Sequence, residues 1–532
     1  MANRFFAKAF LPVYRGRLAG MCAVSGLGGY ALFKDTPRYV DVEKADKEFH
    51  TSSQHTAPPG YTPWKIRNDY PTSDLLKSQN KATKLTPGSP PTLPLPGYGD
   101  DFEGENAPWL KIDFEKNPEL YAEAIREYCF DGMVPADFRP QDNTVRNWYH
   151  APWMHYRASN TSGNEREPLH GLTFERVTPK YEFARTQDTW LQNWACGFYN
   201  ATGATVFGDM WKNPAAPDFN NNKHFPTGTC VFKILLNNAT NDQLPNMYGS
   251  PSMHAVICSD PPTQPAPKNG RNRDTKASEL RLIQVDFAVV DNRSPIGWVF
   301  GTYMYDCEVK DKEPWNRLTL VGLQWGNDPW LTQAVHTSHP EMKPRESWIN
   351  PKAEDWRKVL AGSRPSWGWN GRMNGPADNF ISACASCHST ASRDPIYLGK
   401  DKTPLSIVPP LKTVDGVTAP EPPKTDADVM IYFRNVPPGV PFDEGLDPDD
   451  LSRYDPSDPK LKSKTKSADY SLQLQVGWAS FNLWQQNNQS WVEKSLRGTR
   501  YVVGLENKPD PADISQRDLL RQGPEVKYKR RD

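Results

Sequence analysis

The sequence predicts an α+β, β-rich fold, in which an antiparallel β-sandwich-like region is followed by a mainly helical or irregular segment. Short stretches of alternating apolar and polar residues lie between about residues 170 and 335, and this period of two is typical of half-buried strands. Clusters of Pro, Asn and Asp separate the stretches. The chain also has 51 prolines, which interrupt helices and central strands and favour short elements joined by ordered loops.

The 532-residue chain is long enough for two or three domains. Its 37% hydrophobic and 24% charged content allows a packed core and argues against disorder of the whole chain. Basic and acidic residues balance at 63 each. Nucleic acid is therefore not a predicted partner, because neutralising phosphates requires a basic excess or a basic stripe.

Residues 1–33 predict an N-terminal targeting or membrane-anchor segment. An apolar or small-residue stretch spans 18–33, and the first acidic residue is Asp35. Four basic residues precede the stretch: Arg4, Lys8, Arg15 and Arg17. A secretory signal has this charge order, but no clear small-x-small cleavage site follows. The stretch is short for a bilayer span unless residues at its ends, such as Lys34, reach the interface.

This charge order also predicts a location. The positive-inside bias keeps the basic end in the cytoplasm and places the rest of the chain on the far side. We therefore expect an N-terminally anchored protein on the periplasmic side of the inner membrane. The alternative is a bipartite presequence, which would deliver a eukaryotic protein to the mitochondrial intermembrane space.

Residues 34–107 predict a Pro-rich linker. They are mostly polar and include the proline-dense sequence TPGSPPTLPLPGYGDD, which favours an extended polyproline-II spacer. After the linker, 117–129 predicts a helix. Asn117 suits the N-cap, Pro118 suits the first helical position, and good helix formers follow.

A β-rich domain is predicted over 108–350, led by that helix. The clearest strand candidates are 229–236, 282–290, 297–305 and 318–325. In 282–290, the apolar residues Ile283, Val285, Phe287 and Val289 alternate with the polar Gln284 and Asp286. The pattern predicts an antiparallel sheet, in two layers, that buries one face of each strand. A further strand is expected at 471–477 (SLQLQVG), and the polar tail 506–532 is expected to be mobile.

The chemically most specific pattern is Cys384-Ala385-Ser386-Cys387-His388. Two thiols about one helical turn apart can add to the two vinyl groups of haem, and the histidine beside the second cysteine can bind the iron. This CxxCH pattern predicts one covalently attached haem c, with His388 as the proximal iron ligand. The surrounding residues, 351–505, are expected to form a haem-binding region packed on the β-rich domain.

Zinc binding and a redox-active dithiol are the other interpretations of the CxxC pair. A zinc site needs a second ligand pair, and no Cys or His follows His388. A redox dithiol is expected near a βαβ pattern, whereas this region is proline-rich and irregular. Cys22 lies in the N-terminal stretch. Five scattered cysteines are interpreted as buried free thiols, with disulfides as the alternative: Cys129, Cys196, Cys230, Cys258 and Cys307.

Several residues are candidates for the distal iron ligand. Met430 lies downstream of the motif, where small c-type cytochromes usually place an axial methionine, and Met373 precedes the motif. His254, His336 and His339 are further candidates. A lone methionine at near-helical spacing is more often a core residue than a ligand. A site without a second protein ligand would be open to a small molecule.

The sequence leading into the motif, WGWNGRMNGPADNFISACASCHSTAS (367–392), resembles the large monohaem cytochrome c family proteins, which are mostly bacterial. The resemblance covers about residues 140 to 445 and includes NWYHAPWMH, HGLTFER, QNWACGFYN, FPTGTCVFKILL, GWVFGTYMYD, GLQWGNDP and YFRNVPPGVPFD. It implies haem attachment, iron binding and electron transfer, carried over onto Cys384, Cys387 and His388. It implies no substrate.

These features favour a monohaem c-type cytochrome that exchanges electrons with a redox partner protein, rather than a stand-alone enzyme. Three residues near the motif are candidates for packing on the haem edge or pairing with its propionates: Trp367, Trp369 and Arg372. One alternative function is a haem-dependent oxidoreductase with a pocket in the β-rich domain, lined by His150, His155 and His170. Another is an exported β-sandwich that binds or senses a ligand.

Overall fold

The computed structural model describes residues 57–76, 107–154, 166–214, 216–220, 224–259, 273–354, 367–394, 397–398, 403–404, 411–414, 417–420, 430–450 and 453–488. The chain divides into two units, Met1–Tyr39 and Val40–Asp532, and all of these residues lie in the second unit. The predicted segment 1–33, Cys22, the proline-dense part of the linker, His155 and the tail 506–532 lie outside them. Among the described helices, none combines the length and apolarity that crossing a bilayer requires.

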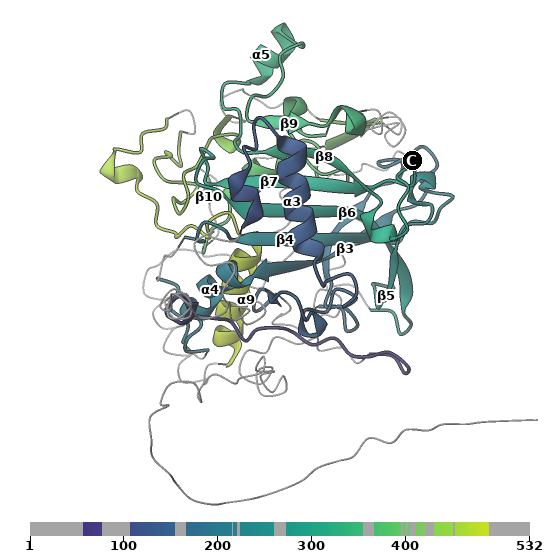
Figure 1. Cartoon of the computed structure of the whole chain (residues 1–532). Coiled ribbons are helices and arrows are strands. Elements are labelled where there is room, and N and C mark those ends of the chain that lie inside the picture. The colour runs from purple at the N-terminus through teal and green to yellow at the C-terminus, as the bar shows by residue number, and fades with distance from the viewer. Residues whose placement is uncertain are drawn as a thin grey trace, which may run out of the picture. The chain divides into compact units, whose positions relative to one another are not determined.

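The described strands include nine that form one large sheet (Figure 1). They are β1 (Trp148–Tyr149), β2 (Thr173–Thr178), β3 (Leu191–Asn200), β4 (Cys230–Asn237), β5 (Ser252–Ala255), β6 (Ser278–Val290), β7 (Trp298–Tyr305), β8 (Leu318–Gln324), β9 (Ser347–Ile349), β10 (Tyr397–Leu398), β11 (Thr403–Pro404), β12 (Leu411–Val414) and β13 (Val417–Pro420). The predicted strands at 229–236, 282–290, 297–305 and 318–325 are confirmed as β4, β6, β7 and β8.

The helices are α3 (Pro118–Phe130), α4 (Ala201–Met210), α5 (Gln333–Ser338), α7 (Cys384–Ser389) and α9 (Leu472–Asn488). Short 3-10 helices are η2 (Pro108–Lys111), η3 (Pro140–Asp142), η4 (Pro245–Met247), η5 (Pro314–Asn316), η6 (Trp369–Gly371) and η7 (Pro459–Leu461). Helix α3 is the one predicted at 117–129. Most of the 3-10 helices begin at a proline, whose fixed φ suits a first turn, and this accounts for part of the high proline content.

Nine strands form one antiparallel sheet, in the order β1-β3-β4-β6-β7-β8-β9, with β2 added beside β3 and β5 beside β6. The β-rich, antiparallel α+β class is thus confirmed. The expected second sheet layer is not: among the described residues, the other strands form only the pairs β10–β11 and β12–β13. Helices and irregular segments cover the large sheet instead. Period-two alternation reveals a buried strand face but does not reveal what covers it.

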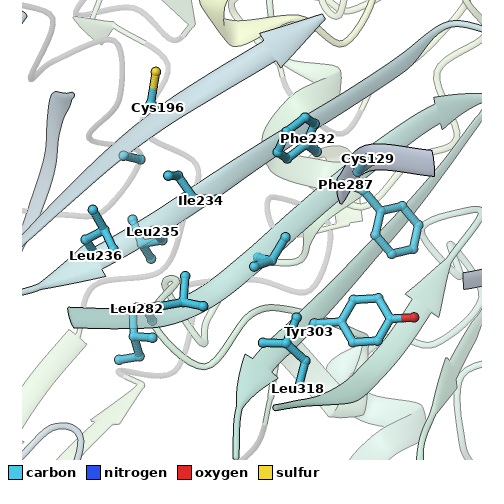
Figure 2. Packing of buried hydrophobic residues seen from close by; sticks show 14 of the residues in the cluster. Cys129, Cys196, Phe232, Ile234, Leu235, Leu236, Leu282, Phe287, Tyr303 and Leu318 are labelled. Carbon is cyan, nitrogen blue, oxygen red and sulfur yellow. The ribbon is translucent and has the colours of Figure 1, made fainter. Parts of the chain in front are cut away.

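Helix α3 covers one face of the sheet (Figure 1). The main hydrophobic core lies beneath it and contains Phe232 of β4, Phe287 of β6 and Tyr303 of β7, whose side chains project from neighbouring strands in Figure 2. Val285 and Val289 lie in the same cluster, as the alternation in 282–290 predicts. Burying side chains of this size contributes roughly 2 kcal/mol each, so this face provides much of the stability of the sheet.

A second core covers the opposite face of the sheet. Here Phe300 of β7 lies in one cluster with Ala385 of the CxxCH motif and with Trp478 of α9. Val231 of β4 and Ala288 of β6 pack against the same cluster and are partly exposed. Residues from the last third of the chain therefore close the face that holds the motif.

Helix α9 corrects the strand predicted at 471–477. The alternation of Leu and Gln there has a period of two, yet Ser471 caps a helix: its Oγ accepts a hydrogen bond from Leu474 N at 3.0 Å. The buried residues Leu474, Trp478 and Phe481 are spaced four and three apart, which is the period of one helix face. A serine followed by a long segment without proline was the signal for a helix.

Part of the predicted linker is packed instead of extended. Trp64 and Ile66 are buried, and Trp64 N donates a hydrogen bond to Pro168 O at 2.7 Å. Arg67 Nη2 donates to Asn147 Oδ1 at 2.7 Å. These residues lie upstream of the proline-dense sequence. Burying the Trp64 and Ile66 side chains stabilises the packed conformation, whereas an extended spacer would leave both side chains in water.

Candidate functional site

Helix α7 carries the three motif residues on one side. Cys384 and Cys387 are three residues apart, His388 is four residues after Cys384, and such positions are neighbours on a helix surface. All three side chains are partly accessible, whereas Ala385 and Ser386 between them are buried. The described part of the chain thus leaves the two thiols and the imidazole partly uncovered and packs the rest of the helix.

The sheet holds the first turn of α7. Ala385 N donates a hydrogen bond to Gln324 Oε1 of β8 at 2.9 Å, and Gln324 Nε2 donates to Gly326 O at 2.8 Å. The first N–H groups of a helix have no acceptor within the helix. Gln324 Oε1 supplies such an acceptor from the adjacent sheet. Both the oxygen and the nitrogen of its side-chain amide are hydrogen-bonded. This contact fixes the motif over the strands.

His388 is oriented by a backbone carbonyl. Its Nδ1 lies 2.7 Å from Tyr470 O, and a carbonyl only accepts, so Nδ1 carries the hydrogen. Burial lowers the pKa of His388 to about 4, although the Tyr470 carbonyl works in the opposite direction. The ring is therefore neutral at pH 7, and Nε2 retains its lone pair. Within the described residues, this ring has no other hydrogen bond.

The carbonyl that orients His388 belongs to a strained turn. Asp469 (φ 48°) and Tyr470 (φ 65°) both lie in the left-handed region, which is costly for a bulky residue such as Tyr470. The Asp469 carboxylate stabilises the turn by accepting hydrogen bonds from Phe225 N (2.7 Å) and Gly439 N (3.0 Å). The turn directs the Tyr470 carbonyl at the imidazole.

The two motif thiols are protonated and unpaired in this structure. Burial raises the pKa of Cys387 to about 12 and holds the pKa of Cys384 well above its usual range. Both cysteines are free. A redox-active dithiol requires a lowered thiol pKa, so these surroundings disfavour that interpretation. Within the described residues, no three His, Cys, Asp or Glu side chains are grouped so that they could hold a metal ion.

Two aromatic residues that the sequence did not single out lie beside the motif. The Tyr432 hydroxyl is 2.6 Å from Ser382 Oγ and also interacts with the Cys387 thiol. The Phe300 ring of β7 is centred 5.0 Å from the His388 ring. Tyr432 belongs to a phrase that carries the family resemblance, but neither its residue type nor its spacing marks it as part of a site.

The two methionine candidates lie in different places. Met373 is fully buried in the core beneath α7, together with Phe300 and Ala385. Met430 packs against a separate cluster that contains Trp369 and Phe433. Both clusters include residues at or next to the motif, but Met373 shares its cluster with Cys384 itself.

The three histidine candidates for the distal position are elsewhere in the molecule. His254 lies on β5, where its register partner is Glu279. His336 is in α5, and His339 pairs with Glu341 beyond that helix. None of the contacts of these histidines that the structure describes involves α7.

Arg372 does not have the role suggested for it. Its guanidinium donates to four backbone carbonyls, those of Asn327, Asp328, Leu331 and Trp369, at 2.7–3.1 Å. It also lies over the Phe433 ring at 4.4 Å. These bonds hold the loop after β8 and leave little capacity for a propionate. Trp367 and Trp369 are buried in hydrophobic clusters, as the packing alternative predicts.

The histidines expected to line an enzymatic pocket are not grouped around α7. His150 is fully buried beside Trp64 and Phe198, and its Nδ1 accepts a hydrogen bond from Arg67 N at 2.9 Å. His170 lies 3.4 Å from Asp137. Their contacts are with the segment before β1 and the loop after α3, so these two histidines have structural surroundings.

The five scattered cysteines are thiols and not disulfides in the structure, as the sequence predicts. Four are buried, and Cys307 is partly exposed. Cys129 of α3 and Cys230 of β4 are in contact, with 3.6 Å between their sulfur atoms. They line the core on the face of the sheet opposite α7.

Two thiols and one neutral imidazole therefore lie on the same face of the sheet, next to aromatic and small apolar residues. Comparison of the chain with protein families, with curated proteins and with solved structures finds no match.

Proposed function

We propose that this protein is a monohaem c-type cytochrome that transfers electrons, with haem c attached through Cys384 and Cys387. The observation that best supports the proposal is the state of His388: its Nδ1–H is bonded to the Tyr470 carbonyl, and its Nε2 lone pair is left available. Histidines that bind metals usually donate their other ring N–H to a carbonyl or carboxylate, which fixes the ring and raises its basicity.

The surrounding residues fit a haem. The two thiols are free, protonated and on the same side of a helix as the imidazole. Val231 and Ala288, on the strands that face α7, are apolar and partly exposed. A haem would cover such surface and remove it from water, which is favourable.

When bound, the haem supplies a one-electron redox couple. In the proposed site, Cys384 and Cys387 would hold the group covalently and His388 would bind its iron. The Tyr470 carbonyl keeps the imidazole in one orientation, and the Phe300 and Tyr432 side chains pack beside the motif. Met373, buried beneath α7, and Met430, in a separate cluster, both stay candidates for a second iron ligand.

The proposal extends to location and partners. Haem attachment to CxxCH takes place outside the cytoplasm, and the charge order of residues 1–33 suits export followed by anchoring. We place the protein on the periplasmic side of the inner membrane, or in the intermembrane space in a eukaryote. A redox partner protein would supply or remove the electron.

The proposal is tested by expressing the full chain in a host that matures c-type cytochromes. We expect haem that remains with the protein on a denaturing gel and a pyridine haemochrome spectrum of the c type. The double variant Cys384→Ser/Cys387→Ser should lose all covalent haem, because no thiol remains to add to the vinyl groups. Cys307→Ser is the matched control and should retain it. A wild-type chain without covalent haem in this host would refute the proposal.

A further inference from the structure

Charged side chains lie on the same face of the sheet as α7, in its middle. Lys233 of β4 and Asp286 of β6 are register partners, and Lys233 Nζ lies 3.1 Å from Asp286 Oδ2. Asp286 Oδ1 also accepts hydrogen bonds from Gln284 Nε2 (2.7 Å) and Thr302 Oγ1 (2.9 Å). This ion pair occupies central strands, where apolar side chains are the norm.

Gln284 links the ion pair to the segment that leads into the motif. The same Nε2 donates to Asp378 Oδ2 at 2.9 Å, and Ala377 N donates to Gln284 Oε1 at 2.9 Å. Asp378 is six residues before Cys384. Asn379 follows Asp378, and its backbone O accepts a hydrogen bond from Asn374 Nδ2 at 2.7 Å. Asn374 Oδ1 in turn is 3.4 Å from Cys384 Sγ. A short series of contacts therefore connects Asp286 to the first haem-attachment thiol.

A β-bulge adds a third carboxylate. Phe174 pairs with Trp194 and Arg176 pairs with Asn193, so Glu175 is an extra residue in β2. Bulges redirect a side chain relative to a regular strand and are common beside active sites. The Glu175 carboxylate interacts with Lys233, Asp286 and Asp378. We call Glu175, Lys233, Asp286 and Asp378 the charged cluster.

The charged cluster and the motif share one environment. The Asp378 and Asp286 carboxylates add to the effect of burial in raising the pKa of the Cys384 thiol. Lys233 and Asp378 also act on His388. Like the motif residues, Lys233 and Asp286 are partly accessible, with 25% and 19% of the side-chain surface exposed. A charge placed at the motif would therefore act on these carboxylates.

Burial disfavours the charged form of two of the cluster's carboxylates, Glu175 and Asp286. Burial raises the pKa of both Glu175 and Asp286, and Lys233 opposes that rise. The titratable groups that face them are Lys233 from β4 and Asp378 from the loop before α7, with Cys384, Cys387 and His388 on α7. In the mature protein the two thiols would be thioethers and would not titrate.

We propose that the charged cluster takes up a proton when the haem at Cys384, Cys387 and His388 is reduced, so that electron transfer is coupled to proton transfer. The inference rests on the proposed function. One electron passes from the redox partner to the haem, and one proton passes from solvent to a carboxylate oxygen of the cluster. The electron adds one negative charge near three carboxylates, and the proton cancels it.

The sign of the effect follows from charge. An added negative charge disfavours neighbouring carboxylates, so the proton affinity of the cluster is higher in the reduced state. Between the pKa values of the two redox states, raising the pH makes reduction harder and the reduction potential falls. Outside this window the potential is constant. A tenfold difference in proton affinity between the two states corresponds to about 59 mV.

The test is the reduction potential of the haem-loaded full chain, measured spectroscopically from pH 5 to pH 9. We expect the potential to fall with pH in the wild type. Asp286→Asn should flatten the curve, because it removes a titrating carboxylate and retains an acceptor for Thr302 and Gln284. The matched control is Asp306→Asn, a buried aspartate at the end of β7 that accepts a hydrogen bond from Thr319. It should leave the curve unchanged.

Glu175→Gln and Asp378→Asn provide two further variants if Asp286→Asn does not fold. A wild-type potential that is constant across this pH range would overturn the proposal. So would a pH dependence that none of these three variants alters, because it would then belong to another group, such as a haem propionate. Either result with covalent haem present leaves the proposed function intact, whereas absence of covalent haem defeats the proposed function itself.

Discussion

At the scale of single residues, the chemistry of the site is set by burial. The same desolvation keeps the two thiols protonated and His388 neutral, because a low-dielectric environment penalises the charged form of every group. A neutral imidazole is the form that binds a metal ion. The raised pKa values keep both thiols in the less nucleophilic, protonated form in this fold.

The lowered pKa of His388 predicts a pH-dependent stability of the haem-free chain. An unfolded histidine titrates near 6.5, whereas His388 in the fold titrates at about 4. Between these values the unfolded state binds more protons, so stability falls as the pH drops from 6.5 towards 4, by at most about 1.4 kcal/mol per pH unit.

This prediction is measured by urea denaturation at pH 7.0, 5.5 and 4.5 in the Cys384→Ser/Cys387→Ser background, which cannot attach haem. His388→Gln should reduce the loss of stability at low pH, and the exposed His254→Gln should not. If the free energy of unfolding falls equally with pH in His388→Gln and in its parent, the lowered pKa of His388 is contradicted.

At the scale of elements, the strained turn before α9 connects two parts of the site. The turn places the Tyr470 carbonyl against the His388 ring. Its Asp469 carboxylate accepts hydrogen bonds from Phe225 N and Gly439 N. Left-handed residues other than glycine persist only where surrounding bonds over-determine them. Asp469 supplies those bonds, so it acts on the proposed haem site as a positioning residue.

Replacing Asp469 tests this role. Asp469→Ala leaves the buried Phe225 N–H and the part-buried Gly439 N–H without this acceptor, which costs on the order of 3 kcal/mol. It should also weaken the bond from His388 to Tyr470, which lowers the basicity of the imidazole and raises the reduction potential. Asp469→Asn retains one acceptor and tolerates a positive φ, so both effects should be smaller.

Thermal denaturation and the reduction potential measure the two effects. Asp458→Ala is the control, since Asp458 caps η7 by accepting a hydrogen bond from Lys460 N and lies apart from the motif. A potential that is unchanged in a folded Asp469→Ala protein would show that the turn has only a structural role.

At the scale of the whole molecule, the motif and the sheet depend on each other. Ala385 bonds to Gln324, 61 residues away, and Phe300 of β7 packs on His388. The sequence predicts a haem-binding region at 351–505 packed on a β-rich domain, but the described contacts make the strands part of the site itself. Gln324 and Phe300, both before residue 351, are in direct contact with α7.

A fragment of residues 351–505 should therefore fail to form the site. We expect it to unfold without a cooperative transition, because α7 and α9 lose the sheet face on which they pack. Any haem that it carries should lack the single spectrum of the full protein. The control is a chain that lacks only residues 1–33. A fragment that unfolds cooperatively and has the spectrum of the full protein would contradict this dependence.

Several parts of the fold could be predicted because their signals are local. Alternation in 282–290 predicted β6 and its buried face, and Asn117 with Pro118 predicted the start of α3. The same alternation misled at 471–477, where a capping serine and a long segment without proline produce α9. The alternation does not indicate what covers the polar face of β6, where Gln284 and Asp286 lie under the segment that leads into the motif.

No local sequence pattern indicates which residues surround the motif. Tyr470 contributes a backbone carbonyl from 82 residues away, and every residue type has that group. Glu175 reaches the charged cluster through a bulge in β2, and Tyr432 reaches Cys387 from the helical residues 430–432. Arg372 looked like a propionate partner by residue type, yet its donors bind carbonyls of the loop after β8.

What the sequence alone determined about this protein is its local chemistry: two thiols and an imidazole at the spacing that haem attachment requires, and the period of the central strands. These depend on neighbours within one turn or one strand. The tertiary structure decided which groups face the motif, namely the Tyr470 carbonyl, Gln324 and the charged cluster. The physical reason is that a buried polar group needs a partner, but its residue type does not specify which distant part of the chain provides it.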